Sequence, residues 1–110
     1  MADTDQIVDV SITASDPDWL AEFVRRLVRD KLAACGNIIP GVRSIYTWDG
    51  AVHDDAETLV VLHTRKARVQ DIIERANQEH ADETPQVIAT EAVDVHPGYR
   101  QWVIDSTTAS

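Results

Sequence analysis

Hydrophobic residues along the first third of the chain change from the spacing of a strand to that of a helix. Residues 6–13 alternate apolar and polar side chains and predict a strand. Asp16 and Pro17 then provide a helix N-cap and a first helical residue. Apolar residues follow at intervals of three or four, at Leu20, Phe23, Val24, Leu27, Val28 and Leu32. This spacing predicts an amphipathic helix, which we expect to end near Cys35 and Gly36.

The middle of the chain has the pattern of a long β-hairpin. Residues 37–48 are rich in Ile, Val, Tyr and Trp, which favour strands. They are interrupted by Pro40-Gly41, and because proline has no N–H to donate, this pair belongs at a strand edge or a bulge. Asp49-Gly50 predicts a tight two-residue turn. The return strand is expected over about residues 51–64.

The last third predicts a helix, a strand and a short helical tail. Helical spacing marks a second helix at about 66–79, and Pro85 precedes a strand at about 86–94. A turn at His96-Pro97-Gly98 leads to a terminal segment that looks helical. The order β-α-β-β-α-β predicts a ferredoxin-like α+β sandwich with two helices on one face of an antiparallel sheet. Its length of 110 residues predicts one domain, with its core at about 6–104.

The predicted hairpin is too long for the domain that carries it. A return strand of about 14 residues spans roughly 45 Å at about 3.3 Å per residue. A compact domain of this size has a diameter of about 35 Å. The hairpin should therefore overhang, with Ile45, Tyr46, Trp48 and a free strand edge exposed, unless bends at Pro40-Gly41 shorten it. Because exposed edges are normally paired or covered, we expect a homo-oligomer joined through strands.

Charge and cysteine content narrow the classes of partner. The chain has 19 acidic and 10 basic residues, a net charge of −9, which argues against nucleic acid and anionic membranes as partners. Abundant Asp with scarce Lys favours a halophilic source, where salt screens self-repulsion. The chain contains no run of about 18 apolar residues, so no membrane span is predicted, and no signal peptide is expected. The single cysteine, Cys35, suggests a reducing, cytoplasmic setting.

Several segments of the chain resemble one known family. The central block contains Lys31-Leu-Ala-Ala-Cys35, Asn37-Ile-Ile-Pro-Gly41, Ser44-Ile-Tyr46 and Trp48-Asp-Gly50. Matching positions elsewhere are Thr13-Ala14, Thr64, Thr84-Pro85, Tyr99 and Trp102. Together these resemble the CutA family of divalent-cation tolerance proteins over about residues 6–104.

This resemblance implies a fold and an assembly similar to the PII signalling proteins. It implies a homotrimer built by pairing of the long hairpins and the last strand. The family is associated with tolerance to divalent metals, especially copper, and no enzymatic reaction is implied. The absence of catalytic motifs agrees with this, since the chain has neither a Gly-x-Ser-x-Gly nucleophile motif nor a glycine-rich phosphate loop. We therefore expect a protein that is not an enzyme and needs no cofactor, although a divalent ion would be bound as a ligand.

The candidate metal ligands lie in the segment Glu79-His-Ala-Asp-Glu-Thr-Pro85. Imidazole suits copper, zinc or nickel, and neighbouring carboxylates would complete a site, so His80, Glu83 and Asp82 are the expected ligands. In the family this loop lines a cleft between subunits, and copper has been attached to a first-strand cysteine and loop histidines. This chain has Ile12 and Glu79 at those positions. Copper is the first expectation, followed by zinc or a harder cation; a solvated loop with His80 packed at an interface is the alternative.

The remaining candidates have simpler interpretations. Cys35 is a soft ligand once deprotonated, but its small neighbours favour a buried side chain. His53 with Asp54 and Asp55 would make a weak surface site or a charged strand edge. The aromatic residues Tyr46, Trp48 and Trp102 would form a pocket at a subunit boundary, or pack in the core.

Two functions follow from these observations. The first is a cytoplasmic trimer that responds to divalent metals and binds them between subunits. The second is a PII-like sensor or adaptor that binds a small molecule, has no dedicated metal site and signals to a protein partner that the sequence does not identify. A purely structural trimer is a third interpretation.

Overall fold

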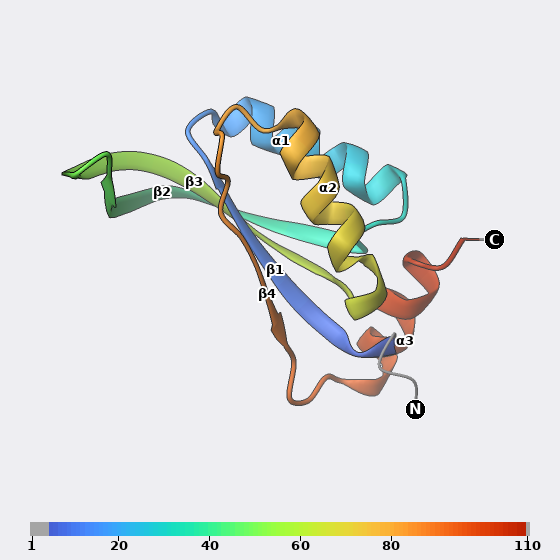
Figure 1. Ribbon diagram of the computed structural model, residues 1–110. Helices are drawn as coiled ribbons and strands as arrows, with labels where there is room; N and C mark the ends of the chain where they lie inside the picture. Colours follow the sequence, from blue (N-terminus) through green and yellow to red (C-terminus); the bar gives the residue numbers. More distant parts are fainter. Residues whose placement is uncertain (1–4, 110) are drawn as a thin grey trace.

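The computed structural model describes residues 5–109 and contains one four-stranded antiparallel sheet with the order β2-β3-β1-β4. Helices α1 and α2 lie side by side on one face of the sheet (Figure 1). This topology confirms the ferredoxin-like fold predicted from the order of the elements. The elements are β1 (Ile7–Ala14), α1 (Pro17–Arg29), β2 (Cys35–Trp48), β3 (Ala51–Arg65), a 3-10 turn η2 (Lys66–Arg68), α2 (Val69–Glu79), β4 (Val87–Glu91) and α3 (Pro97–Ser106).

The core lies between this face of the sheet and the two helices. Alternate residues of β1 and β3 point into it, which is the pattern of a sheet covered on one side. The apolar stripe of α1 packs against them, as its spacing predicted. The fully buried members include Val10, Ile12, Leu20, Phe23, Leu27, Val60, Leu62 and Ile72. Within residues 5–109, no helix is both long enough and apolar enough to cross a membrane.

The first helix is shorter than its apolar pattern predicted. We expected it to end near Cys35 and Gly36, but α1 ends at Arg29. Lys31 adopts a left-handed conformation with φ 62°, which an α-helix does not tolerate. The backbone N–H of Ala34 then donates to the carbonyl of His63, so the chain has joined the sheet where helix was expected.

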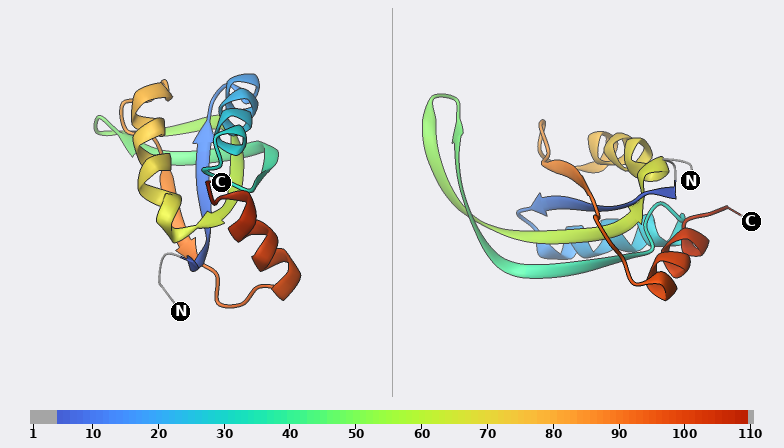
Figure 2. Two further views of the ribbon diagram at one scale, coloured as in Figure 1. Left: turned by 90° about the vertical axis from the view of Figure 1, so that its right-hand side faces the viewer. Right: turned by 90° about the horizontal axis from the view of Figure 1, so that it is seen from below.

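The hairpin formed by β2 and β3 extends well beyond the helices and curves at its far end (Figure 2). Its turn has positive φ at both Asp49 (51°) and Gly50 (74°), as a type I′ turn requires. The expected irregularity at Pro40-Gly41 is a bulge between Ile39 and Val42. The molecule measures 45 × 26 × 22 Å, in agreement with the predicted overhang.

In the distal part of the hairpin, β2 and β3 pair with each other and with no other described strand. The ladder between β1 and β3 ends at Ala14 and Thr58, so residues 51–57 of β3 pair with β2 alone. Apolar side chains are exposed in this region, among them Ile45 (66%) and Val52 (75%). Both long edges of the distal hairpin are therefore free in the isolated chain.

Helix α3 covers one end of the opposite face of the sheet. Tyr99 contacts Cys35 and His63, whose side chains alternate with those of the core. The end of α3 is held by Arg65, which donates to both the hydroxyl and the carbonyl oxygen of Thr107 (2.9 and 2.8 Å).

The last strand is shorter than the predicted 86–94, since β4 ends at Glu91.

Ion pairs join the ends of α1 and α2. The Glu79 carboxylate accepts hydrogen bonds from Arg26 (2.8 Å) and Arg75 (2.9 Å), and Arg75 also contacts Asp30 (3.0 Å). Burial raises the pKa of Glu79, but the hydrogen bonds and charges of both arginines outweigh it and leave that pKa below the usual 4.5. This network fixes the C-terminal end of α2, where the candidate metal-binding loop begins.

Candidate functional site

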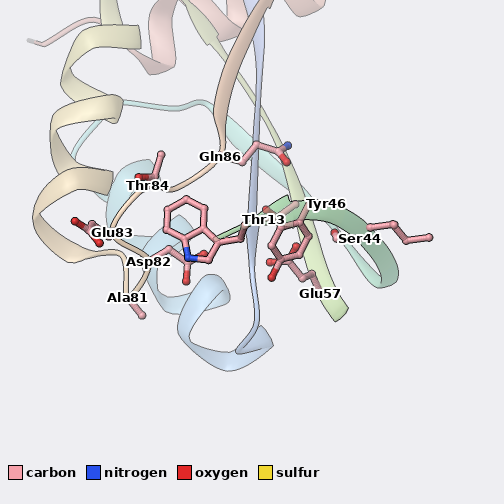
Figure 3. Close-up of a pocket in the computed structure, with 11 residues that line it drawn as sticks. Thr13, Ser44, Tyr46, Glu57, Ala81, Asp82, Glu83, Thr84 and Gln86 are labelled. Carbon is pink, nitrogen blue, oxygen red and sulfur yellow. The ribbon is translucent and has the colours of Figure 1, made fainter. Parts of the chain in front are cut away.

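A cavity of about 600 Å³ lies between the loop after α2 and the distal hairpin. Tyr46, Trp48 and Glu57 line it from the hairpin, and Asp82, Glu83 and Thr84 line it from the loop. Figure 3 shows the loop residues and Tyr46 on opposite sides of this space. Sequence reasoning placed Asp82 and Glu83 in a cleft, and the structure brings them together with two of the three predicted pocket aromatics.

His80 anchors the loop to the core. Only 2% of its side chain is exposed. Its Nε2 donates to the carbonyl of Thr13 (2.8 Å), while Nδ1 accepts from the backbone N–H of Asp82 (2.9 Å). The ring also packs edge-on against Trp19, with centroids 5.1 Å apart. Both ring nitrogens are therefore engaged, and a metal ion would have to replace one of these hydrogen bonds.

The other expected ligands are open to solvent. Asp82 and Glu83 are exposed, and a carboxylate oxygen of Asp82 lies 3.9 Å from Nδ1 of His80. Among residues 5–109, no three His, Cys, Asp or Glu side chains gather closely enough to hold a metal ion. A metal site of higher coordination would therefore need further ligands beyond those grouped here.

Tyr46 is held rigidly in the wall of the cavity. Its hydroxyl donates to Asp55 (2.5 Å), and its ring stacks on His53 with centroids 5.3 Å apart. The hydrogen bond to Asp55 raises the pKa of Tyr46 to about 12, together with burial and the nearby acidic charges. His53 also has Nε2 3.2 Å from the carbonyl oxygen of Trp48.

The predicted surface group of His53, Asp54 and Asp55 does not converge. Asp54 forms two hydrogen bonds with Arg43, at 2.7 and 2.8 Å. These contacts lower the pKa of Asp54 and raise that of Arg43. Asp54 therefore pairs with Arg43 while His53 and Asp55 both contact Tyr46, as in a charged strand edge.

Cys35 and its neighbours form a polar group that sequence reasoning missed. We expected a buried cysteine, but Cys35 is half-buried and its Sγ lies 3.2 Å from the hydroxyl of Tyr99. His63 lies beside them, with Nδ1 2.6 Å from Asp9 and Nε2 2.7 Å from Asn37. The signal was available in the strand register, which pairs His63 with both Asp9 and Cys35.

Trp102 lies apart from the other two predicted pocket aromatics. It packs on Tyr99, with ring centroids 5.5 Å apart, and half of its surface is exposed. Burial and the contact with Cys35 raise the pKa of Tyr99 to about 12. Among the described residues of one chain, the cavity is therefore lined by Tyr46 and Trp48 but not by Trp102, because α3 lies at the other end of the sheet (Figure 1).

Comparison with known proteins identifies relatives across almost the whole chain. The family model for the CutA1 divalent ion tolerance protein matches residues 8–106. The divalent-cation tolerance protein CutA of Thermus thermophilus is 32% identical over 98 residues, which cover 89% of this chain and 95% of the relative. The chloroplastic protein CutA of Arabidopsis thaliana is 34% identical over 98 residues, again 89% of this chain. The chain spans only about half the length of the Arabidopsis protein (54%).

Solved structures agree with the fold. The crystal structure of CutA1 from Oryza sativa matches with a TM-score of 0.92 and 31% identity, covering 99% of this chain and 100% of the other. The Thermus thermophilus protein matches with a TM-score of 0.89 and 30% identity, covering 93% and 99%. Since the family model and the relatives cover nearly all described residues, the chain belongs to the CutA family of divalent ion tolerance proteins.

Proposed function

We propose that this protein is a cytoplasmic homotrimer that contributes to divalent-cation tolerance by binding cations, without catalysing a reaction. The match to the CutA family over residues 8–106 carries this proposal. The free edges and exposed apolar residues of the distal hairpin support strand pairing between subunits. The high acidic charge supports attraction of cations and a source rich in salt.

The proposed cation site is the loop His80–Glu83, in a cleft completed by a neighbouring subunit. Asp82 and Glu83 offer carboxylate oxygens beside the cavity, and His80 offers Nδ1 if its hydrogen bond from the Asp82 N–H opens. Because no three such side chains among the described residues of one chain lie close enough together to hold an ion, a second subunit has to complete the coordination. Copper remains the first candidate because of the imidazole, followed by zinc or a harder cation.

Calorimetric titration with Cu(II), Zn(II) and Mg(II) tests this site in the full chain. We expect His80→Ala to weaken Cu(II) binding, and the pair Asp82→Asn with Glu83→Gln to weaken every ion that binds. Glu22→Gln is the matched control, since Glu22 is an exposed carboxylate on α1. Unchanged affinity in both loop variants would refute the site, and sedimentation equilibrium showing only single chains would refute the trimer.

The cavity favours a second candidate function, a PII-like small-molecule sensor or adaptor. Its volume of about 600 Å³ lies in the range of metabolite sites and is far larger than one metal ion requires. Thermal shifts across a metabolite panel and a metal panel distinguish the two functions. A response to metabolites alone would favour the sensor.

A further inference from the structure

The cavity between the distal hairpin and the loop after α2 combines aromatic and anionic walls. We propose that it binds a small organic ammonium ion, preferably a diamine. This inference goes beyond cation tolerance and rests on the small-molecule function proposed above. It uses the aromatic wall and Glu57, which the proposed metal site does not require.

The aromatic wall is already in place in the isolated chain. Tyr46 is fixed by its stacking on His53 and by the hydrogen bond of its hydroxyl to Asp55. Trp48 also lines the cavity, and 48% of its surface is exposed. A cation over the face of such rings is stabilised by about 0.5–1 kcal/mol at exposed sites. Because one ring is held by its neighbours, little order has to be gained when a ligand binds.

The charge of the cavity selects a cation. Glu57, Asp82 and Glu83 line it, and the described lining includes no Lys, Arg or His. The nearest arginine along the hairpin, Arg43, is already paired with Asp54. Three carboxylates without a basic neighbour on the wall attract a ligand with more than one positive charge.

The polar groups of the cavity favour a cation that donates hydrogen bonds. Besides the carboxylates, Thr13, Ser44 and Thr84 line the cavity, and a hydroxyl can accept a hydrogen bond from an N–H group. A primary ammonium offers three such donors, whereas a quaternary ammonium offers none. The methylene chain of a diamine would lie against the rings of Tyr46 and Trp48. These features together favour an alkyl diamine over either a bare metal ion or a quaternary ammonium.

Calorimetry with putrescine as the probe tests the proposal at constant ionic strength. We expect putrescine to bind, and to bind more tightly than 1,4-butanediol, tetramethylammonium or Mg(II). Trp48→Ala and Glu57→Gln should each weaken putrescine binding by about two- to fivefold. The matched controls are Trp102→Ala, which removes an equally exposed tryptophan outside the cavity, and Glu22→Gln; neither should change the affinity.

Several results would overturn the assignment. Equal binding of butanediol would show that charge is not recognised, and equal binding of Mg(II) would show a general counterion effect. Glu57→Gln keeps the size of the side chain and removes its charge. Unchanged affinity of this variant for putrescine would show that the ligand does not bind in this cavity. If the unaltered chain does not bind putrescine but responds to other molecules of the metabolite panel, this inference alone is overturned. If it responds to no metabolite, the small-molecule function on which the inference rests fails with it.

Discussion

Replacement of Gly36 by alanine tests how tightly β2 packs under α1. A Cβ atom at this position would lie 2.7 Å from Cγ1 of Val24, 3.0 Å from Cγ2 of Val60 and 3.1 Å from Cδ2 of Leu62. Overpacking of a core by one carbon costs about 1–3 kcal/mol. Alanine recovers about 0.5–1 kcal/mol, because glycine loses more backbone entropy on folding. We expect a net loss of about 1–2 kcal/mol, and each kcal/mol lowers the midpoint of thermal unfolding by about 4–8 °C.

A double-mutant cycle with Val24→Ala measures the cause of this loss. Removal of the Val24 methyl groups eliminates the shortest contact, so Gly36→Ala should be less costly in the Val24→Ala background. Urea unfolding at one protein concentration gives the free energies, since the midpoint of an oligomer depends on concentration. A Gly36→Ala variant as stable as the parent, or an equal loss in both backgrounds, would refute the packing argument.

Three further predictions concern charge. Because the folded pKa of Glu79 is lowered, its contribution to stability is present above pH 4.5 and is lost as the pH falls through the lowered value; urea unfolding of Glu79→Gln should show a weaker acid dependence, and an unchanged one would contradict the network. Tyr46 and Tyr99, the two tyrosines of the chain, should ionise near pH 12 rather than 10 by ultraviolet titration. Asp55→Asn should lower only the Tyr46 value, and a shift of neither would exclude the hydrogen bond. Thermal unfolding should shift upward between low salt and about 1 M NaCl, where screening acts within about 3 Å, and a downward shift would argue against self-repulsion of the acidic chain.

Most of the fold follows from local patterns in the sequence. The hairpin was predictable because Asp49-Gly50 selects its turn, and the core because Leu20, Phe23 and Leu27 repeat at helical spacing. The end of α1 at Arg29 was not predictable, since Leu32 continues the apolar pattern beyond it. Only the left-handed backbone at Lys31 and the entry of the following residues into the sheet end the helix there. Tertiary pairing therefore determined a boundary that periodicity could not show.

The sequence indicated some of the residues that line the cavity, but not how they are arranged. Residue types selected Asp82 and Glu83 as candidate ligands, and the family resemblance implied that their loop lines a cleft between subunits. The structure places both in the lining of a cavity with Tyr46 and Trp48. That His80 uses both nitrogens within the fold depends on Thr13, which is distant in sequence. The contribution of Glu57 depends on its pairing with Val42 in the hairpin register, which no motif of residue types marks.

The turn between β2 and β3 has a consequence for the order of folding. The ladder from Trp48 and Ala51 grows outward from residues adjacent in sequence, whereas the pairing of Val8 with Glu91 joins the two ends of the chain. Hairpins with a favourable turn form in about 1–10 μs, and distant pairs form later because a long loop has to close first. We therefore expect the distal part of the β2–β3 hairpin to form early during refolding. Its edges would then be available to other chains before β4 completes the sheet.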